Sequence, residues 1–305
     1  MSTPVQENAA RQFIYPIDGL DAAPQGVCSA RIKPRGPLGD AGPGEAPEVT
    51  AIMGERVHVA LVRTPRGAAS QLFTNPAEQF HYVLEGGLVV DIDGKLVEVP
   101  KGHAVHVPAG LAHRVLAGGD ADLVTYSVQD ARQDFAFAPL APAGTGTHAR
   151  AQTSNVTGRD VRYAYDIGGL ESVPPGVLSA KVTPRNYISK KSTSLGAALS
   201  GERVHVAVIG KIRATGTKLH THPNEQFSFM LQGRAKYEIE GRFADAPRGS
   251  VTHIPPGTVH GVVAYPDEDL LTFVAKDTTH GMSGPPIDGI EDGPVYWPGF
   301  DPRKK

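Results

Sequence analysis

Short runs of apolar residues, each ended by Gly, Pro or an Asp-Gly pair, recur along the whole chain. Examples are VHVALV at 57–62, HYVLEGGLVVDI at 81–92, KLVEV at 95–99 and HAVHVP at 103–108. Runs of this length, rich in valine and partly alternating with polar residues, are typical of β-strands. The Asp93-Gly94 pair between two runs is a hairpin signal. The pattern therefore predicts an all-β protein built as a sandwich or barrel.

The strand pattern occurs twice, at a fixed distance along the chain. GERVHVALV begins at Gly54 and GERVHVAVI begins 147 positions later, at Gly201, and the segments NPAEQF and HPNEQF keep the same offset. A repeat of this length indicates duplication of a whole domain. We therefore expect two similar domains, residues 1–150 and 151–305, joined by the small, polar segment 138–158.

Composition and charge limit the possible functions. With 305 residues the chain can bury two cores, and its net charge of −2 gives no electrostatic reason to expect nucleic acid or a membrane as partner. The single cysteine, Cys28, excludes an intrachain disulfide, and no apolar run has the length of a signal core or membrane span. We expect a cytoplasmic protein that acts on a small molecule and can form a homodimer.

The end of the chain has a different character. Its last 25 residues contain Tyr296, Trp297 and Phe300 among several prolines. One interpretation is an extended arm that packs these rings on a barrel of the same chain or of a second subunit. The other is a lid over a site.

Three histidines in the second repeat have the spacing of a metal site. His220 and His222 are two residues apart, so on a strand their side chains point to the same face, and Gln226 returns to that face four residues later. His260 can complete the set from a neighbouring strand. Ordinary strand histidines are the alternative interpretation. Three imidazoles and an amide are a suitable ligand set for a divalent transition metal, namely Fe, Mn, Co, Ni, Zn or Cu.

The first repeat tests this interpretation. At the same offset, Phe73 and Asn75 replace the two paired histidines, while Gln79 and His113 are kept. One imidazole, one amide and a phenyl ring cannot hold a divalent ion tightly, because such ions need several good donors. We therefore expect one metal ion per chain, in the second domain only.

Residues that occur in both repeats are expected to be structural. Glu225 is an alternative metal ligand, but it has the wrong strand parity and recurs as Glu78 in the repeat that lacks the histidine pair. The other recurring residues are expected to form hydrogen bonds or ion pairs within the fold. They are the histidine pairs His58/His205 and His106/His253, and the pairs Glu55-Arg56 and Glu202-Arg203.

Two motifs around these residues resemble those of the cupin superfamily. The first runs from Gly216 through both histidines and Gln226 to Gly233, and the second, G-x5-P-x-G-x2-H, matches in full from Gly249 to His260. The resemblance covers both repeats and implies a bicupin, with two tandem antiparallel barrels of the jelly-roll, or double-stranded β-helix, type. Each barrel is expected to have a pocket at one end. Glutamine in place of the usual glutamate is similar to cupins of uronate breakdown and to the bicupin isomerase of bacilysin biosynthesis.

The ligand set favours one class of chemistry. Without an anionic ligand, the ion is a strong Lewis acid, which favours isomerisation or tautomerisation of a small carbonyl or enol compound through a metal-bound enolate. Ser228 and Met230 share the strand parity of Gln226 and are expected to contact the substrate. A non-haem Fe(II) dioxygenase acting on an aromatic or dicarbonyl substrate is one alternative. A non-enzymatic bicupin that binds a metal and a ligand is the other.

Overall fold

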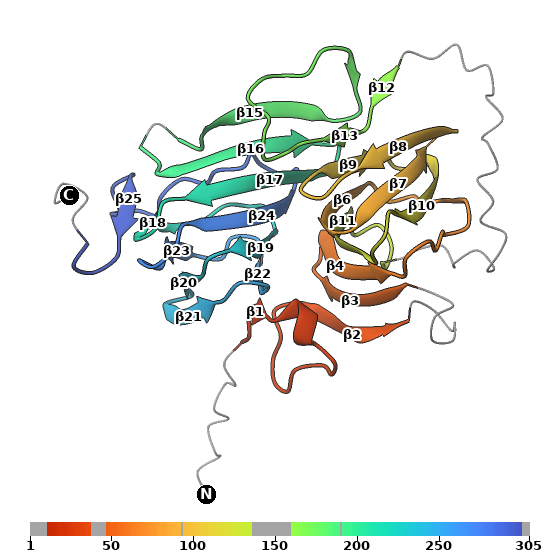
Figure 1. Ribbon diagram of the computed structural model, residues 1–305. Helices are drawn as coiled ribbons and strands as arrows, with labels where there is room; N and C mark the ends of the chain where they lie inside the picture. The colour runs from red at the N-terminus through yellow and green to blue at the C-terminus, as the bar shows by residue number, and fades with distance from the viewer. Residues whose placement is uncertain (1–10, 38–46, 93, 136–159, 190, 301–305) are drawn as a thin grey trace, which may run out of the picture.

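Secondary structure is almost entirely β-strand, as the sequence predicts (Figure 1). The computed structural model describes residues 11–37, 47–92, 94–135, 160–189 and 191–300. Within these ranges one 3₁₀ turn, η1 (Ile17–Gly19), is the only helical element, and no helix has the length and apolar character that crossing a membrane requires. The linker predicted at 138–158, and with it the division of the chain at residue 150, lies outside the described residues.

The N-terminal barrel consists of a large and a small antiparallel sheet. Its strands are β2 (Arg31–Pro37), β3 (Glu48–Met53), β4 (Val57–Thr64), β5 (Phe73–Thr74), β6 (Gln79–Glu85), β7 (Gly87–Ile92), β8 (Lys95–Val99), β9 (Ala104–Val107), β10 (Ala112–Gly118), β11 (Leu123–Asp130) and β13 (Ala164–Tyr165). The large sheet has the order β13-β9-β6-β11-β4-β3-β2, and the small sheet has the order β5-β10-β7-β8. The predicted run 81–92 is divided at Gly86, whose φ of 72° is a conformation that favours glycine.

The C-terminal barrel repeats this arrangement. Its strands are β1 (Ile14–Tyr15), β15 (Lys181–Tyr187), β16 (Ser194–Ser200), β17 (Val204–Lys211), β18 (Thr215–His220), β19 (Gln226–Gln232), β20 (Ala235–Ile239), β21 (Arg242–Ala246), β22 (Val251–Ile254), β23 (His260–Ala264), β24 (Leu270–Asp277) and β25 (Pro294–Tyr296). The large sheet has the order β1-β22-β19-β24-β17-β16-β15, and the small sheet has the order β21-β20-β23-β18-β25. A separate parallel pair is formed by β12 (Val161–Arg162) and β14 (Val177–Leu178).

The two repeats exchange one short strand each, from near the start of the repeat. β1, from the start of the chain, pairs with β22 of the C-terminal barrel, and β13, from the second repeat, pairs with β9 of the N-terminal barrel. The carbonyl oxygen of Phe13 accepts a hydrogen bond from the backbone N–H of His253 at 2.8 Å, and that of Tyr163 accepts one from His106 at 2.9 Å. Each barrel is thus completed by a strand from the other half of the sequence.

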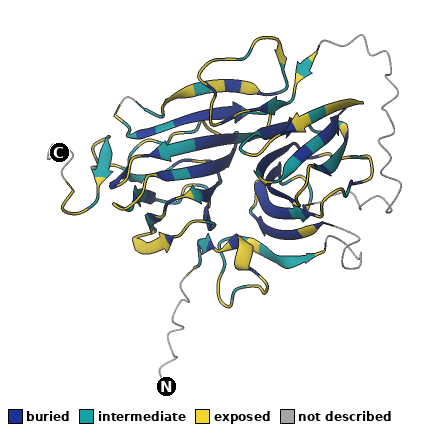
Figure 2. Ribbon diagram, in the orientation of Figure 1, coloured by how far each residue is buried: buried dark blue, intermediate teal, exposed yellow. Residues whose placement is uncertain are grey.

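The largest hydrophobic cluster lies between the two large sheets, where Figure 2 shows buried strands of both barrels. Tyr126 of the N-terminal barrel stacks on Phe229 of the C-terminal barrel with ring centroids 4.7 Å apart, and Tyr82 contacts Phe273 at 4.8 Å. Fully burying a side chain such as Phe stabilises a fold by about 1.5–3 kcal/mol. This shared core joins the barrels into one unit.

Buried glutamates add a polar contact between the barrels. Glu225 immediately precedes β19 and is completely buried. Its carboxylate accepts hydrogen bonds from the backbone N–H groups of Glu55, Arg56 and Val57 at 2.8–2.9 Å. It also accepts one from Nε2 of His253 at 2.9 Å. One side chain of the C-terminal barrel therefore binds three backbone donors of the N-terminal barrel.

Glu78 makes the same contact in the opposite direction. Its carboxylate accepts hydrogen bonds from the backbone N–H groups of residues 202–204 at 2.9–3.0 Å and from Nε2 of His106 at 2.8 Å. Gly54 and Gly201 are required here, because a Cβ atom would lie 2.2 Å and 2.1 Å from the facing glutamate oxygens. The repeated Glu-Arg pairs contribute backbone donors to these contacts. Arg56 also forms an ion pair, at 3.7 Å, but its partner is Asp277 and not the adjacent Glu55.

Candidate metal centre

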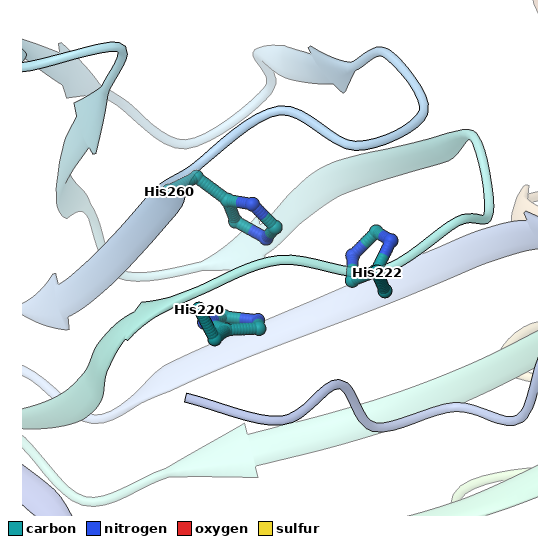
Figure 3. Close-up of side chains that lie close together, drawn as sticks. All are labelled: His220, His222 and His260. Atoms are coloured by element: carbon teal, nitrogen blue, oxygen red, sulfur yellow. The ribbon is translucent and has the colours of Figure 1, made fainter. Parts of the chain in front are cut away.

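Three histidines surround one point in the C-terminal barrel (Figure 3). His220 ends β18, His222 lies in the turn that follows, and His260 begins β23 directly opposite His220 in the sheet. One ring nitrogen from each lies within 4.8 Å of the other two. His222 and His260 are buried and His220 is partly buried. The strand pairing therefore brings together the three imidazoles that sequence spacing selects.

Backbone hydrogen bonds fix the tautomer of each imidazole. Nδ1 of His220 lies 2.9 Å from the carbonyl oxygen of Lys218, Nδ1 of His222 lies 3.0 Å from that of Asn224, and Nδ1 of His260 lies 2.9 Å from that of Thr258. A carbonyl oxygen only accepts, so each Nδ1 carries the proton and each Nε2 keeps a lone pair. Nε2 of His222 is buried without a hydrogen-bond partner. Three oriented lone pairs fit a metal ion.

Burial keeps the imidazoles in the neutral form that binds metals. It lowers the pKa of His222 to about 4, places the pKa of His260 well below its usual value, and lowers that of His220. The positive charge of Lys276 lowers all three pKa values further. No proton therefore has to leave an imidazole when a metal ion binds near neutral pH.

Gln226, the fourth predicted ligand, lies next to this group. Its side chain lines the same cavity as His220 and His260. The amide nitrogen donates a hydrogen bond to Oγ of Ser228 at 3.1 Å. With the nitrogen engaged, the carbonyl oxygen is the atom available to a metal ion. Coordination by Gln226 stays a prediction.

A cavity of about 390 Å³ adjoins the histidines and is lined by strands of both sheets of the C-terminal barrel. Strand alternation determines which side chains reach it. On β24, Thr272, Val274 and Lys276 line the cavity, whereas Phe273 and Ala275 point into the shared core between the barrels. One strand thus serves the site with one face and the interdomain packing with the other.

Comparison with known families agrees with this arrangement. The family model described as "Cupin domain" matches residues 60–129 and 211–275, one match in each barrel. The chain belongs to the cupin superfamily. Two tandem cupin barrels, as the sequence motifs imply, are therefore confirmed.

Several solved structures share the tandem cupin fold. AerE from Microcystis aeruginosa is 11% identical, with a TM-score of 0.56 over 81% of this chain and 98% of that chain. A variant of Bacillus subtilis oxalate decarboxylase is 14% identical, with a TM-score of 0.59 over 92% and 81%. YlbA from E. coli is 13% identical, with a TM-score of 0.58 over 91% and 97%. No curated protein matches the chain, and these identities establish the fold alone.

Of the two side chains expected to contact the substrate of this cupin, one lines the cavity. Ser228 is on the cavity wall. Met230 is completely buried in a hydrophobic cluster with Phe13, Tyr237 and Leu270 and does not line the cavity. Strand parity gives the face to which a side chain points but not how far along the strand the cavity extends. In this structure Met230 is therefore a core residue, and contact of Ser228 with a substrate stays a prediction.

Two buried lysines line the cavity, although the motifs do not include them. Nζ of Lys276 donates a hydrogen bond to the carbonyl oxygen of Met282 at 2.8 Å, and burial lowers the lysine pKa to about 7. Nζ of Lys211 donates to Oγ of Ser194, and burial lowers its pKa to about 8. The sequence does contain a signal for these residues. Each is a single lysine at or next to the last residue of its strand, at a position where alternation points the side chain into the barrel.

The C-terminal arm packs on its own cupin barrel and also borders the cavity. β25 pairs with β18, and the ring of Trp297 contacts that of Tyr265 at 4.4 Å. Residues 282–286 line the cavity beside the histidines. Both sequence interpretations of the arm, aromatic packing and covering of a site, therefore describe part of its structure.

Gly284 allows the arm to approach the metal centre closely. A Cβ atom at this position would lie 2.2 Å from the carbonyl oxygen of Thr221 and 3.0 Å from Cβ of His222. We expect Gly284→Ala to displace the arm and to weaken metal binding by roughly 10-fold, the lower end of the effect of disturbing groups around metal ligands. Calorimetric titration with Zn²⁺ measures the change. Gly281→Ala, which meets no atom within 4 Å, is the control and should bind like the unaltered protein. Equal affinities for all three proteins would contradict the assignment.

The N-terminal cupin barrel keeps the ring geometry but not the ligands. Phe73 and His113 lie 4.2 Å apart at 50°, the same values as His220 and His260. The amide oxygen of Asn75, which replaces His222, accepts a hydrogen bond from Ala77 N–H at 2.9 Å. Among the described residues, only the C-terminal histidines form a metal-competent cluster of His, Cys, Asp or Glu. One metal ion per chain stays a prediction.

Proposed function

We propose that the protein is a metal-dependent cupin enzyme that isomerises or tautomerises a small carbonyl compound. The observation that supports this proposal is the convergence of three neutral imidazoles, each with an oriented Nε2 lone pair, beside a cavity of about 390 Å³. A divalent ion held there without a carboxylate ligand would polarise a substrate carbonyl and stabilise the negative charge that develops on its oxygen.

Side chains of the cavity suit a small, partly apolar substrate. Ile209, Val262 and Val274 supply an apolar wall, and Ser228 and Tyr237 supply hydroxyl groups. Burial raises the pKa of Tyr237 to about 12. The phenol therefore keeps its proton at neutral pH and donates a hydrogen bond that orients a substrate oxygen.

Deuterium exchange tests this function because it reports removal of a proton from the substrate whatever the final product is. A panel of small ketones, keto acids and enols is incubated with metal-loaded protein in D₂O and followed by NMR. We expect at least one compound to exchange the hydrogen next to its carbonyl group, with no consumption of O₂ in a parallel electrode measurement. The His220→Ala/His222→Ala variant is the control and should exchange only at the uncatalysed rate.

Two results would replace the proposal by one of its alternatives. Stoichiometric O₂ uptake with an aromatic or dicarbonyl compound would identify a dioxygenase, which three imidazoles can also support. Tight binding of a compound without exchange, uptake or any other turnover would identify a non-enzymatic binding protein. The N-terminal barrel shows that a cupin barrel of this chain can persist without the histidine pair.

A further inference from the structure

The charged side chains that line the cavity are mostly cationic. The carboxylate that lines it among the described residues, that of Asp292, is exposed. The two charged side chains that are buried in the wall are both lysines, Lys211 and Lys276. Lys191 and Lys218, at less buried positions, add further positive charge. The cavity therefore presents a positive potential to its ligand.

The buried amines have neutral partners only. Lys276 donates to a carbonyl oxygen and Lys211 to a hydroxyl group, and no ion pair among the described residues involves either lysine. The carboxylate of Asp277, the next residue on β24, accepts hydrogen bonds from the backbone N–H groups of Glu225 and Thr279. Its charge raises the pKa of Lys276, but burial outweighs this effect and the pKa stays lowered. A buried charge without a counter-charge is costly. An anion in the cavity would offset that cost.

The two lysines occupy separate positions along the cavity. Lys211 on β17 pairs with Leu270 at one end of β24, whereas Lys276 lies at the other end, opposite Gln226. Lys276 follows Leu270 by six positions, which correspond to about 20 Å along the strand. Both side chains nevertheless line the same cavity as His220 and His260.

The N-terminal barrel is an internal comparison. At the offset of the repeat, Thr64 replaces Lys211 and Gln129 replaces Lys276, and both replacements are buried and neutral. The barrel with Phe73 and Asn75 in place of two histidines therefore also lacks both cations. The lysines and the histidine pair occur together, which indicates that they serve one ligand.

We propose, building on the proposed function, that the substrate is a small carbonyl compound with two anionic groups, in its simplest form a dicarboxylate. Lys276 binds the carboxylate group nearest the imidazoles, and Lys211 binds the second group further along β24. The aliphatic side chains of Ile209, Val262 and Val274 contact the carbon chain between them. The cavity volume of about 390 Å³ limits the compound to a small molecule.

Calorimetric titration of metal-free protein with succinate tests the proposal independently of catalysis, because succinate has no carbonyl group to isomerise. Butyrate and the neutral diamide of succinate are the comparison ligands. We expect succinate to bind most tightly and the diamide not to bind measurably. Lys276→Met should weaken succinate binding by about 10- to 100-fold and also weaken butyrate binding, since each charged hydrogen bond contributes that much. Lys211→Met should weaken succinate binding only.

Controls separate these effects from folding and net charge. Lys181→Met removes a positive charge at an exposed position of β15 and should leave all affinities unchanged. Melting temperatures show whether each variant is folded, and methionine in place of a buried lysine is expected to be tolerated. Lys276→Arg, which keeps the charge, should retain more succinate affinity than Lys276→Met. Equal binding of succinate and its diamide, or unchanged succinate affinity in either methionine variant, would overturn the proposal.

Discussion

Replacing His220 and His222 together by alanine is expected to abolish metal binding in the C-terminal barrel. The two residues supply two of three Nε2 donors, and the remaining imidazole of His260 cannot hold a divalent ion tightly. Even changes around metal ligands weaken affinity by about 10- to 100-fold, so we expect a loss larger than about 100-fold. Titration with Zn²⁺ and with Co²⁺, whose visible spectrum reports coordination, measures it.

The matched control changes the corresponding residues of the other barrel. Phe73→Ala/Asn75→Ala also removes two side chains beside a histidine, His113, and should leave the metal affinity unchanged. Retention of tight metal binding by the His220→Ala/His222→Ala variant would show that the ion lies elsewhere. The same conclusion would follow if only the control variant lost its metal.

Replacing Glu225 by alanine is expected to cause the largest loss of stability of any single change described for this protein. Its completely buried carboxylate serves three backbone N–H groups of the other barrel and the imidazole of His253. Removing one partner of a buried charged network leaves the others unsatisfied and typically costs about 3–5 kcal/mol. Chemical unfolding of the metal-free protein measures the effect without a contribution from the nearby ligands. Glu268→Ala, at an exposed position, should change the free energy of unfolding by less than about 0.5 kcal/mol.

The contribution of Glu225 should also depend on pH. Burial alone would raise its pKa, but the hydrogen bond and charge of His253, together with the backbone donors of Arg56 and Glu55, lower it below the usual value of 4.5. A carboxyl group with a lowered folded-state pKa stabilises the fold above its unfolded pKa, and this stabilisation is lost as the pH falls through the folded-state value. The stability difference between the unaltered protein and Glu225→Gln should therefore be constant from pH 6 to 7 and shrink below about pH 4.5. A difference that grows on acidification would contradict the role of the ionised carboxylate.

The strands and the histidine cluster could be predicted because their signals are local. Alternation over five to eight residues identifies strands such as β4 and β8. The spacing of His220 and His222 fixes their common face, and the repeat supplies the comparison with Phe73 and Asn75. The exchange of β1 and β13 between the barrels could not be predicted. β1 and β13 are two residues long, so they are too short to show an alternating pattern of apolar and polar residues. Contacts with the other barrel determine which strands they pair with.

The roles of single residues around the site could not be predicted, because they depend on how far the cavity extends into the barrel. No local sequence pattern gives that extent. Ser228 and Met230 have the same parity, yet only Ser228 reaches the cavity, because a hydrophobic cluster fills the barrel at the level of Met230. Strand alternation predicts that Lys276 points into the barrel. Its burial could not be predicted, because the C-terminal arm contributes to it: the amine donates its hydrogen bond to the carbonyl oxygen of Met282. Strand parity predicts that Glu225 points away from the histidines, and in the structure its carboxylate binds the other barrel. Its partners in the other barrel are distant in sequence and only the fold reveals them.

Metal stoichiometry tests the central claim, one site per chain in the C-terminal barrel, most directly. Elemental analysis of the unaltered protein, loaded with a divalent transition metal and freed of excess by gel filtration, should give close to one ion per chain. The three imidazoles of His220, His222 and His260 account for that ion, and the N-terminal barrel offers only His113 at the corresponding position. Finding no bound metal, or two ions per chain, would contradict the account.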